Sequence, residues 1–503
     1  MTARLPSTRI RSMRAALETA RRKPVSRRRG LALTLLASLC VSACGTLTHT
    51  AWQPPVVDVP EQWHTADAAT PATLASTSEP AAPPRPETTD DDANTRTDVD
   101  PWWQAFGDAD LNRLIERALA TSHDLKTAVL NLQAAQFAVD LQHANQMPAL
   151  SASADLANDH SLHGNRYVSH VDALTASASY VVDFWGALAS STEAAKWEAR
   201  ASAQDVRTAK MSVAATVADD YWLLALLTEQ IETSTASVQY DAQTLALTQV
   251  RYQSGAITAI DLLSAQQALA IQRAALNALI LQSTQTQNAL AILIGEAPGE
   301  VFAVPSARLM TTLPSVAPGL PAELLGRRPD VRAAEWRTRS ALADVDATRA
   351  SFYPNLTLTG SAGTASDALR NILQNPIGTL AADITAPILN VWTIKAQVGA
   401  AQTTYDAAAV AFAKTFEQAL CDVENALAAR ADDQAQVDQW THALDAARQS
   451  EQRVAWQYRT GAVALSNWLD AEQATRTTDA ELAGARYALL ANQVGLYVAL
   501  GGR

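Results

Sequence analysis

Two sets of residues have types and spacing that could support chemistry: a cysteine near the N-terminus and a group of three histidines. Cys44 ends the stretch Val41-Ser42-Ala43-Cys44, which follows a short apolar run from Leu31 to Leu39. This tetrapeptide resembles a bacterial lipobox, in which the cysteine sulfur is acylated and cleavage makes the cysteine the new N-terminus. Cys44 is therefore predicted to carry a lipid anchor. The alternative is an ordinary signal peptide with an incidental cysteine.

The three histidines, His160, His163 and His170, cluster between two predicted strands. We predict that they lie in a polar surface loop, because no acidic or cysteine ligands at metal-site spacing accompany them. A metal site there is the alternative. Serine, histidine and aspartate occur throughout the chain, but no nucleophile elbow, phosphate loop or zincin spacing is present. The sequence therefore predicts neither an enzyme nor a cofactor.

Residues 1–43 have the features of a secretory signal peptide. Residues 1–30 hold ten Lys or Arg and one acidic residue, and the apolar run that follows is far shorter than the roughly 20 residues of a membrane-spanning helix. Removing this leader, of charge 10 − 1 = +9, changes the net charge from −12 to −12 − 9 = −21. Such an acidic chain is a poor partner for nucleic acid. Of the three cysteines, only Cys421 would stay unmodified, so no internal disulfide is predicted.

Residues 44–100 are predicted to form a lipid-anchored N-terminal segment followed by a disordered linker. Between Thr65 and Asp100 the chain is rich in Pro, Thr, Ala and Asp. A segment of this composition cannot bury a core. Ordered structure is predicted from Pro101 onward, beginning with an amphipathic helix around Leu111 and Leu119.

The remaining sequence contains an internal duplication with a constant offset of 206 positions. The matched pairs are Asp124 and Asp330, Pro148 and Pro354, Gly255 and Gly461, and Gly295 and Gly501. We predict two repeats, residues 101–299 and 321–503, joined by a linker at 300–320. Two long copies indicate a pseudo-symmetric domain, because a solenoid needs three or more stacked units.

Each repeat is predicted to contain a very long helix and a shorter returning helix. No Gly or Pro occurs between Ala187 and Ser254, which permits a helix on the order of 100 Å long. Apolar or aromatic residues recur there at every seventh position, which indicates coiled-coil packing: Val217, Leu224, Ile231, Val238, Leu245 and Tyr252. After a glycine break the chain returns over Ile257 to Ile294. The second copy runs from Val391 to Arg459 and from Val463 to Leu500, with an interruption expected at Gly399.

Four segments alternate with period two, as strands do. They are Ala149 to Ala157, Val171 to Asp183, Asn355 to Thr364, and Thr379 to Leu389. Strands with one apolar and one small polar face suit a membrane barrel, and a soluble sandwich is the alternative. Four strands cannot close a barrel, and open edges are not tolerated in lipid. Several chains are therefore predicted to share one barrel.

These features together resemble the outer-membrane efflux protein family, the TolC-like outer-membrane factors, and more closely its lipid-anchored NodT branch. The resemblance covers about residues 101–503 and the lipobox. Its most specific part is the run from Leu324 to Glu335, LLGRRPDVRAAE, which opens the second repeat. In this run Pro329 suits the first turn of a helix and Asp330 stabilises its positive end, so we interpret the motif as structural. The stretch Asp183-Phe184-Trp185-Gly186 and the paired Tyr-x-x-Gly breaks also match.

The resemblance implies a mainly α fold with membrane β-structure. It implies a homotrimer in the bacterial outer membrane, with a twelve-stranded β-barrel to which each chain gives four strands, continued by a coiled-coil tunnel into the periplasm. The implied function is the passive exit channel of a tripartite efflux pump that exports small molecules such as drugs. The implied partners are outer-membrane lipid, a periplasmic adaptor protein and an inner-membrane transporter.

The resemblance also implies roles for the two turns between long helices. In the family these tips contact the adaptor, and the matching residues are Ser254, Gly255, Ala256, Thr460, Gly461 and Ala462. A tyrosine and an acidic residue make closing contacts at the aperture, positions that fall on Tyr458 and Asp261. Asp470 would supply an aspartate ring, while Asn467 stands where some members carry a second aspartate. The alternative is that Asp261 and Asp470 are solvated or helix-capping residues.

Two other functions fit parts of the same pattern. A channel of the same fold could serve protein secretion, which the sequence barely separates from drug export. A lipid-anchored periplasmic coiled-coil adaptor or scaffold without a pore is the other alternative. Adaptors usually carry one hairpin between lipoyl-like and β-barrel domains, whereas two hairpins and four strand segments recur here by duplication. This difference favours the channel.

Overall fold

The computed structural model describes residues 49–55, 59–60, 62–63, 101–160, 168–299, 309, 313–316, 319, 321–366, 374, 376–386 and 391–502. The predicted signal peptide, Cys44, His163 and the predicted disordered linker lie outside these residues. Among the helices that are described, none has the length and apolar character needed to cross a membrane.

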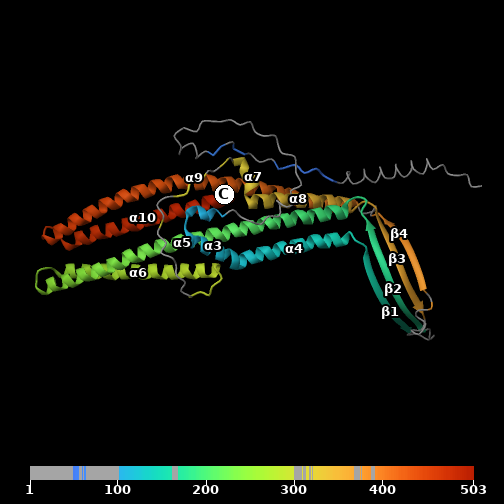
Figure 1. The fold of residues 1–503 in the computed structure, drawn as a ribbon, viewed down its shortest axis with the longest axis horizontal. Coiled ribbons are helices and arrows are strands. Elements are labelled where there is room, and N and C mark those ends of the chain that lie inside the picture. Colours follow the sequence, from blue (N-terminus) through green and yellow to red (C-terminus); the bar gives the residue numbers. More distant parts are fainter. Residues whose placement is uncertain are drawn as a thin grey trace, which may run out of the picture. The chain divides into compact units, whose positions relative to one another are not determined.

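The two repeats have the same order of elements (Figure 1). The first contains η2 (Trp102–Phe106), α3 (Ala109–Thr121), α4 (His123–Asn145), β1 (Ala149–His160), β2 (Val168–Val182), α5 (Ala187–Gln253) and α6 (Ala259–Leu293). The second contains η3 (Pro321–Glu323), α7 (Leu324–Arg327), α8 (Pro329–Ala350), β3 (Asn355–Ser366), β4 (Pro376–Thr385), α9 (Val391–Arg459) and α10 (Leu465–Ala499). The predicted class, long helices with a small sheet and an internal duplication, is confirmed.

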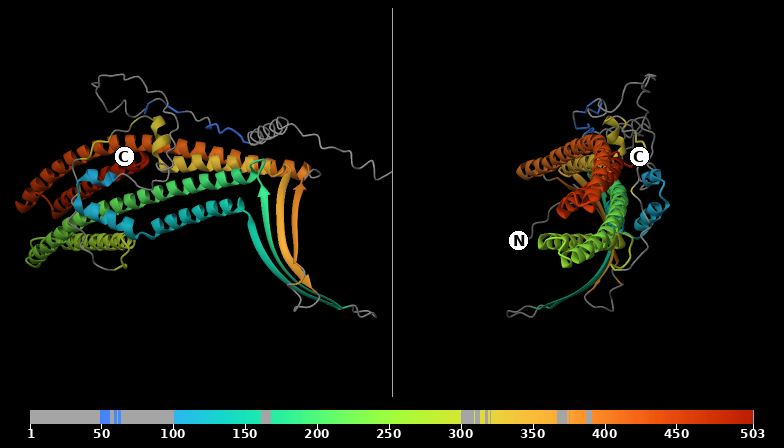
Figure 2. Two further views of the ribbon diagram at one scale, coloured as in Figure 1. Left: turned by 45° about the vertical axis from the view of Figure 1, so that its right-hand side comes forward. Right: turned by 90° about the vertical axis from the view of Figure 1, so that its left-hand side faces the viewer.

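The two long helices are continuous, and each pairs with the helix that follows it. Helix α5 has 67 residues and α9 has 69, close to the lengths predicted from the absence of Pro. The expected interruption at Gly399 is wrong, because α9 runs through this residue without a break. A glycine costs roughly 1 kcal/mol in a helix, which packing along a helix of this length outweighs. The pairs α5–α6 and α9–α10 lie side by side as two hairpins (Figure 2).

The four strands form one antiparallel sheet in the order β1-β2-β3-β4. Ala149 pairs with Ser179 at one end of the first hairpin, and Asn355 pairs with Thr385 in the last. The strand boundaries differ by a few residues from those predicted, since β4 begins at Pro376 rather than Thr379 and ends at Thr385 rather than Leu389. Backbone pairing with β3 extends the strand to Pro376 beyond the alternating pattern.

The histidine loop predicted between the first two strands is shorter than expected. His160 is the last residue of β1 and pairs with Val168, while His170 lies within β2 and pairs with Asn158. Both are strand residues, so the prediction that they lie in a loop is wrong. The ladder continues through the polar run Asn158-Asp159-His160 because backbone hydrogen bonds do not depend on side-chain alternation.

The main apolar core lies where the start of the first repeat meets α5 and α10. Trp102 and Phe106 of η2 both pack on Tyr497 of α10, with ring centroids 5.3 and 5.9 Å apart. Phe106 also packs on Trp222 of α5, at 6.1 Å. Leu111 of α3 is buried in the same cluster. A second cluster joins α7 and α8 to α9 and α10, and it includes Phe416, Val331 and Leu496.

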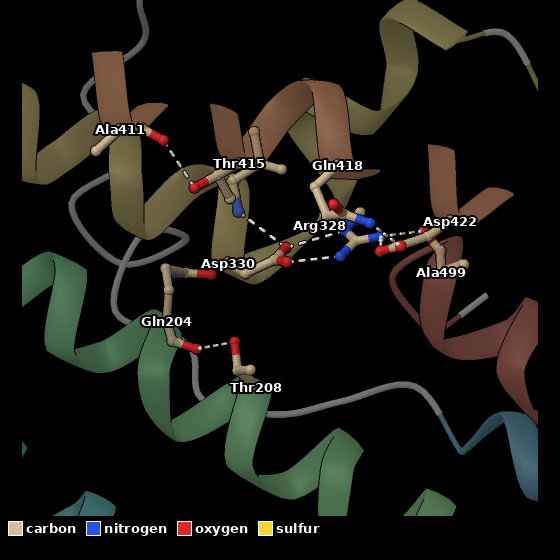
Figure 3. A network of polar contacts seen from close by, with 10 residues as sticks. Gln204, Thr208, Arg328, Asp330, Ala411, Thr415, Gln418, Asp422 and Ala499 are labelled. Carbon is tan, nitrogen blue, oxygen red and sulfur yellow. Dashed lines mark hydrogen bonds and ion pairs between the residues drawn. The ribbon is translucent and has the colours of Figure 1, made fainter. Parts of the chain in front are cut away.

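The hallmark run that opens the second repeat forms a junction between three helices (Figure 3). The buried Arg328 donates from Nε and Nη2 to the carboxylate of Asp330, at 3.0 and 2.6 Å. Its Nη1 donates to Asp422 of α9 at 3.1 Å and to the carbonyl of Ala499 in α10 at 3.3 Å. Arg328 therefore fixes the start of α8 to both helices of the second hairpin, which supports a structural interpretation of the motif.

Described residues before Pro101 contact α8 and the stretch just before the second repeat. Thr50 donates from its backbone N and its Oγ1 to the carboxylate of Asp346, at 2.7 and 2.6 Å. The guanidinium of Arg339 lies 4.0 Å from the ring centroid of Trp52. Trp63 is buried and donates from Nε1 to the carbonyl of Gly319 at 2.9 Å.

Candidate functional site

The two turns at the ends of the hairpins have the same backbone geometry. In the first, Gly255 N donates to Tyr252 O at 3.0 Å and Ala256 N donates to Arg251 O at 2.9 Å. In the second, the same two bonds join residues 461 to 458 and 462 to 457, at 3.0 and 2.8 Å. Gly255 and Gly461 have φ of +72° and +79°. This is the helix C-cap in which glycine tolerates a left-handed conformation. Each hydrogen bond of the first turn has an equivalent 206 positions later in the second turn.

The helix starts after the two turns differ. Thr258 and Asp261 form a capping box at the start of α6, in which Asp261 Oδ2 accepts from Thr258 N at 3.0 Å and from Thr258 Oγ1 at 2.8 Å. The equivalent of Thr258 in the second hairpin is Ala464, which makes no side-chain cap. Asp261 therefore caps its own helix, as one of the two sequence interpretations proposed.

Tyr458 lies in a cluster that joins the two hairpins. Its hydroxyl accepts a hydrogen bond from Arg251 Nη1 of α5 at 3.2 Å. Its ring lies 5.2 Å from the ring of Trp468 in α10, which in turn lies 5.5 Å from Tyr240 of α5. Tyr458, Trp468 and Ala265 of α6 are all buried. Within one chain, Arg251 rather than Asp261 is thus the partner of Tyr458.

Asn467 and Asp470 lie on the first turns of α10 and are both exposed in one chain. Ser466 Oγ lies 3.5 Å from Asn467 Oδ1. The structure thus brings Tyr458 into an inter-hairpin cluster and leaves Asn467 and Asp470 on the surface. The aspartate ring attributed to Asp470 stays a prediction, because it depends on contacts between chains.

Between the main apolar core and the tip, the buried side of α5 becomes polar. Four buried residues follow each other at intervals of seven: Leu227, Ser234, Asp241 and Thr248. The predicted apolar heptad is fully buried at Val217 and Leu224, but Ile231, Val238 and Leu245 are only half-buried. Toward the tip, the face of α5 that packs within its own chain is therefore a polar seam, which we define as Ser234, Asp241 and Thr248.

Arg476 of α10 reaches this seam. Its Nη2 donates to Asp241 Oδ1 at 2.7 Å and also contacts Glu472 Oε1, one helical turn away on α10. Its Nη1 donates to Gln272 Oε1 of α6 at 3.3 Å, and Gln272 Nε2 donates to Ser234 Oγ at 2.9 Å. This inter-hairpin network links α5, α6 and α10. A cavity of about 440 Å³ adjoins it, lined by Arg476, Gln272 and Ser234 among others.

The carboxylates of the network lie in a poorly solvated place. The side chains of Asp241 and Glu472 are 1% and 8% exposed. Burial raises the pKa of Glu472 to about 7, although the hydrogen bond and charge of Arg476 oppose the shift. The negative charges of Asp241 and Glu451 raise the pKa of Glu472 further. Glu472 therefore titrates near neutral pH.

Sequence inspection missed the residues of this network. The spacing of Glu472 and Arg476, four positions apart, is a signal for a pair within one helix. Nothing in the sequence indicated that Asp241, 235 positions before Arg476, would join them. Arg251 was missed in the same way, since its contact with Tyr458 depends on the packing of two hairpins.

Two coiled-coil hairpins with matched tips, together with an open sheet of four membrane-type strands, define an outer-membrane channel protein. Such a protein is a conduit and not a member of an enzyme family. The chain belongs to the outer membrane efflux protein family, whose profile matches residues 114–296 and again residues 320–502. The two matches are offset by 320 − 114 = 206 positions, which agrees with the duplication. The boundaries proposed for the repeats and their linker stay predictions.

Relatives and solved structures agree with this assignment. The pyoverdine export outer membrane protein OpmQ of Pseudomonas putida is 31% identical over 423 residues, which cover 80% of this chain and 87% of the relative. The probable outer membrane lipoprotein SilC of Salmonella typhimurium is 27% identical over a match that covers 80% of this chain and 87% of the SilC chain. The open state of the MtrE outer membrane channel of Neisseria gonorrhoeae has a TM-score of 0.73 at 27% identity, covering 90% of this chain and 98% of that one. This chain is an outer-membrane efflux protein that extends into the periplasm.

Proposed function

We propose that three copies of this chain form one exit channel, with a twelve-stranded barrel to which each copy gives four strands. The observation that carries this proposal is the pair of sheet edges. Strands β1 and β4 each pair with only one neighbour among the described residues. Leu150 of β1 is 82% exposed and Leu380 of β4 is 92% exposed. Because an open edge is not tolerated in lipid, β1 of one copy pairs with β4 of the next.

The channel is passive and takes its energy from its partners. A periplasmic adaptor protein binds the hairpin tips around Gly255 and Gly461, and an inner-membrane transporter drives export. The matched turns support this role, because their exposed residues present equivalent backbone shapes twice in each chain. Tyr458, Asp261, Asn467 and Asp470 surround the aperture at this end. A passive channel requires no catalytic residue.

Cys44 carries the lipid anchor. Only five positions separate Cys44 from His49, the first described residue, which at roughly 3.5 Å per residue allows a reach of about 17 Å. Thr50 is held on Asp346 by two hydrogen bonds. The acyl chain therefore inserts into the outer membrane close to the helix that leads into β3.

The cargo consists of small molecules such as drugs. Relatives named for pyoverdine export, toluene efflux and antibiotic efflux support this class of substrate. Deleting the gene should raise sensitivity to a subset of a compound panel, and restoring it should reverse that change. Unchanged sensitivity to every compound, with secretion of a protein lost instead, would favour the secretion alternative.

Native mass spectrometry of the detergent-extracted protein and conductance in planar bilayers test the assembly directly. We expect a trimer that conducts ions. Release of the acyl chain should leave the trimer in the detergent fraction, because the barrel itself holds it in lipid. A water-soluble monomer without conductance would contradict the channel and support the pore-less scaffold.

A further inference from the structure

The inter-hairpin network places charged groups where a coiled coil normally has apolar ones. Asp241 occupies the seam of α5 seven residues after Ser234 and seven before Thr248, and all three are buried. Burying charged groups costs several kcal/mol per ion unless they are paired and fully hydrogen-bonded. Buried polar residues in a coiled-coil seam fix which helices pair and in which register. The network therefore specifies the contact between α5 and α10.

The charges of this network do not balance. One guanidinium, that of Arg476, faces two carboxylates, those of Asp241 and Glu472. Asp241 Oδ2, Glu472 Oε2 and Arg476 Nε are buried and have no hydrogen-bond partner among the described residues. One bound proton would neutralise the excess negative charge and would convert an acceptor oxygen into a donor.

The charged groups that act on Glu472 come from α5, α9 and α10. Arg476 on α10 attracts it, and Asp241 on α5 and Glu451 on α9 repel it. Tyr240 of α5 lies on the same side, with Arg459 of α9 close to its hydroxyl. Gln272 of α6 binds Arg476 and not the carboxylates. Two negative charges and one direct positive charge thus act on Glu472, so its surroundings favour the protonated form.

We propose that Asp241, Glu472 and Arg476 form a proton-dependent latch, which holds the two hairpins of one chain together and loosens when the buried Glu472 carboxyl loses its proton. The latch closes the contact between α5 and α10. Its role in passage through the channel rests on the proposed exit function, whereas its effect on the hairpin contact does not.

The sign of the pH effect follows from linkage. Burial raises the pKa of Glu472 to about 7 from an ordinary value of 4.5, so the closed contact binds a proton that the separated hairpins release. The contribution of Glu472 to the closed contact is therefore present at low pH and is lost as the pH rises through about 7. Between pH 6 and pH 8 the equilibrium for separating α5 from α10 should increase about tenfold.

The latch belongs to one of the two copies of the hairpin contact. Shifting Asp241 forward by 206 positions gives Ala447, and shifting Glu472 and Arg476 back gives Gln266 and Ala270. These duplicated positions, on α9 and α6, carry no charged group. The latch is therefore not a general requirement of the fold.

Hydrogen exchange measured by mass spectrometry tests the latch on the detergent-solubilised full chain. Comparing each variant with wild type at the same pH cancels the intrinsic exchange rate. Glu472→Gln keeps the shape and cannot ionise, so opening of the contact in this variant should show no pH step. For peptides from α5 and α10, we expect the ratio of the wild-type exchange rate to the variant exchange rate to rise about tenfold between pH 6 and pH 8. The same ratio at both pH values would overturn the latch.

Two further variants sharpen the test. Asp241→Asn removes one negative charge, so the pH step should move to lower pH; a step that stays in place would contradict the role of Asp241. Glu481→Gln, an exposed position on α10, should follow wild type at both pH values. A wild-type chain that never conducts in bilayers would contradict the proposed function, whereas equal exchange ratios would contradict the latch alone.

Discussion

Tyr458 combines two interactions that hold the hairpin ends together. Its hydroxyl binds Arg251, and the guanidinium carbon of Arg251 also lies 5.4 Å from its ring centroid. Its ring packs on Trp468, with the two planes inclined by 30°. The hydrogen bond joins α9 to α5, while the ring contact joins α9 to α10. Substitutions that remove one interaction at a time can therefore separate the two.

Tyr458→Phe removes the hydrogen bond and keeps the ring, so it should lower the local opening free energy at the tips by about 1 kcal/mol. Tyr458→Ala also removes the ring and should lower it by roughly 3 kcal/mol or more. Hydrogen exchange of residues 454–462 measures both changes. Arg251→Ala should have a smaller effect in the Tyr458→Phe background than in wild type, because the hydrogen bond is already absent there. Additive effects of the two substitutions would show that the bond contributes nothing.

At the residue scale, the sequence predicted which residues lie at the hairpin tips better than it predicted which residues they contact. Tyr458 and Asp261 were singled out by their places next to the glycine turns, and the capping role of Asp261 was one of two stated alternatives. Its three-residue spacing from Thr258 is local, so the sequence could carry it. Arg251 and Asp241 were not predicted, because each contacts a residue more than 200 positions away.

At the scale of elements, each hairpin depends on one left-handed glycine. Gly461 has φ of +79° with open space around it, so a methyl group would meet no atom but would strain the backbone. Gly399 lies inside α9, also with open space around it, and its φ is an ordinary helical one. The same substitution should therefore act in opposite directions at these two glycines.

Gly461→Ala should destabilise the second hairpin by about 1 kcal/mol, because the Cβ of alanine is sterically strained in the left-handed conformation. Gly399→Ala should stabilise α9 by about 0.5 to 1 kcal/mol, because alanine has the higher helix propensity. Chemical denaturation followed by circular dichroism measures both. The reverse order of the two variants would show that tertiary contacts, not backbone conformation, decide these positions.

The long helices were predictable to within a few residues because residue type alone marks where they end. Gly255 and Gly461 end α5 and α9, and no proline lies within either helix. Strand limits were less accurate, as at Pro376 and His160, because pairing with a neighbouring strand extends a strand past its own pattern. The coiled-coil seam was only partly predicted. Near the tip, the predicted apolar positions such as Val238 are half-buried, whereas the polar positions such as Asp241 are fully buried. Hydrophobic period alone does not tell which face meets which partner.

At the scale of the whole molecule, α4 has two apolar faces, and one chain covers only one of them. Ala128, Leu132, Ala135 and Val139 are half-buried on one side of the helix. On the opposite side Leu130, Phe137 and Leu141 are 61% to 69% exposed. A helix with apolar residues on both sides needs a neighbour on both. A second copy of the chain is the neighbour that the proposed trimer supplies.

Phe137→Asp places a charge in this second face and should weaken the trimer by about 2 kcal/mol or more per chain, because the carboxylate loses water on assembly. Asn131→Asp adds the same charge to the same helix, away from the stripe formed by Leu130, Phe137 and Leu141, and should leave assembly unchanged. Native mass spectrometry of both variants, extracted at equal concentration, measures the trimer fraction. Full assembly of the Phe137→Asp chain would exclude this face of α4 from the contact between copies, and the trimer would then depend on the sheet edges at β1 and β4 alone.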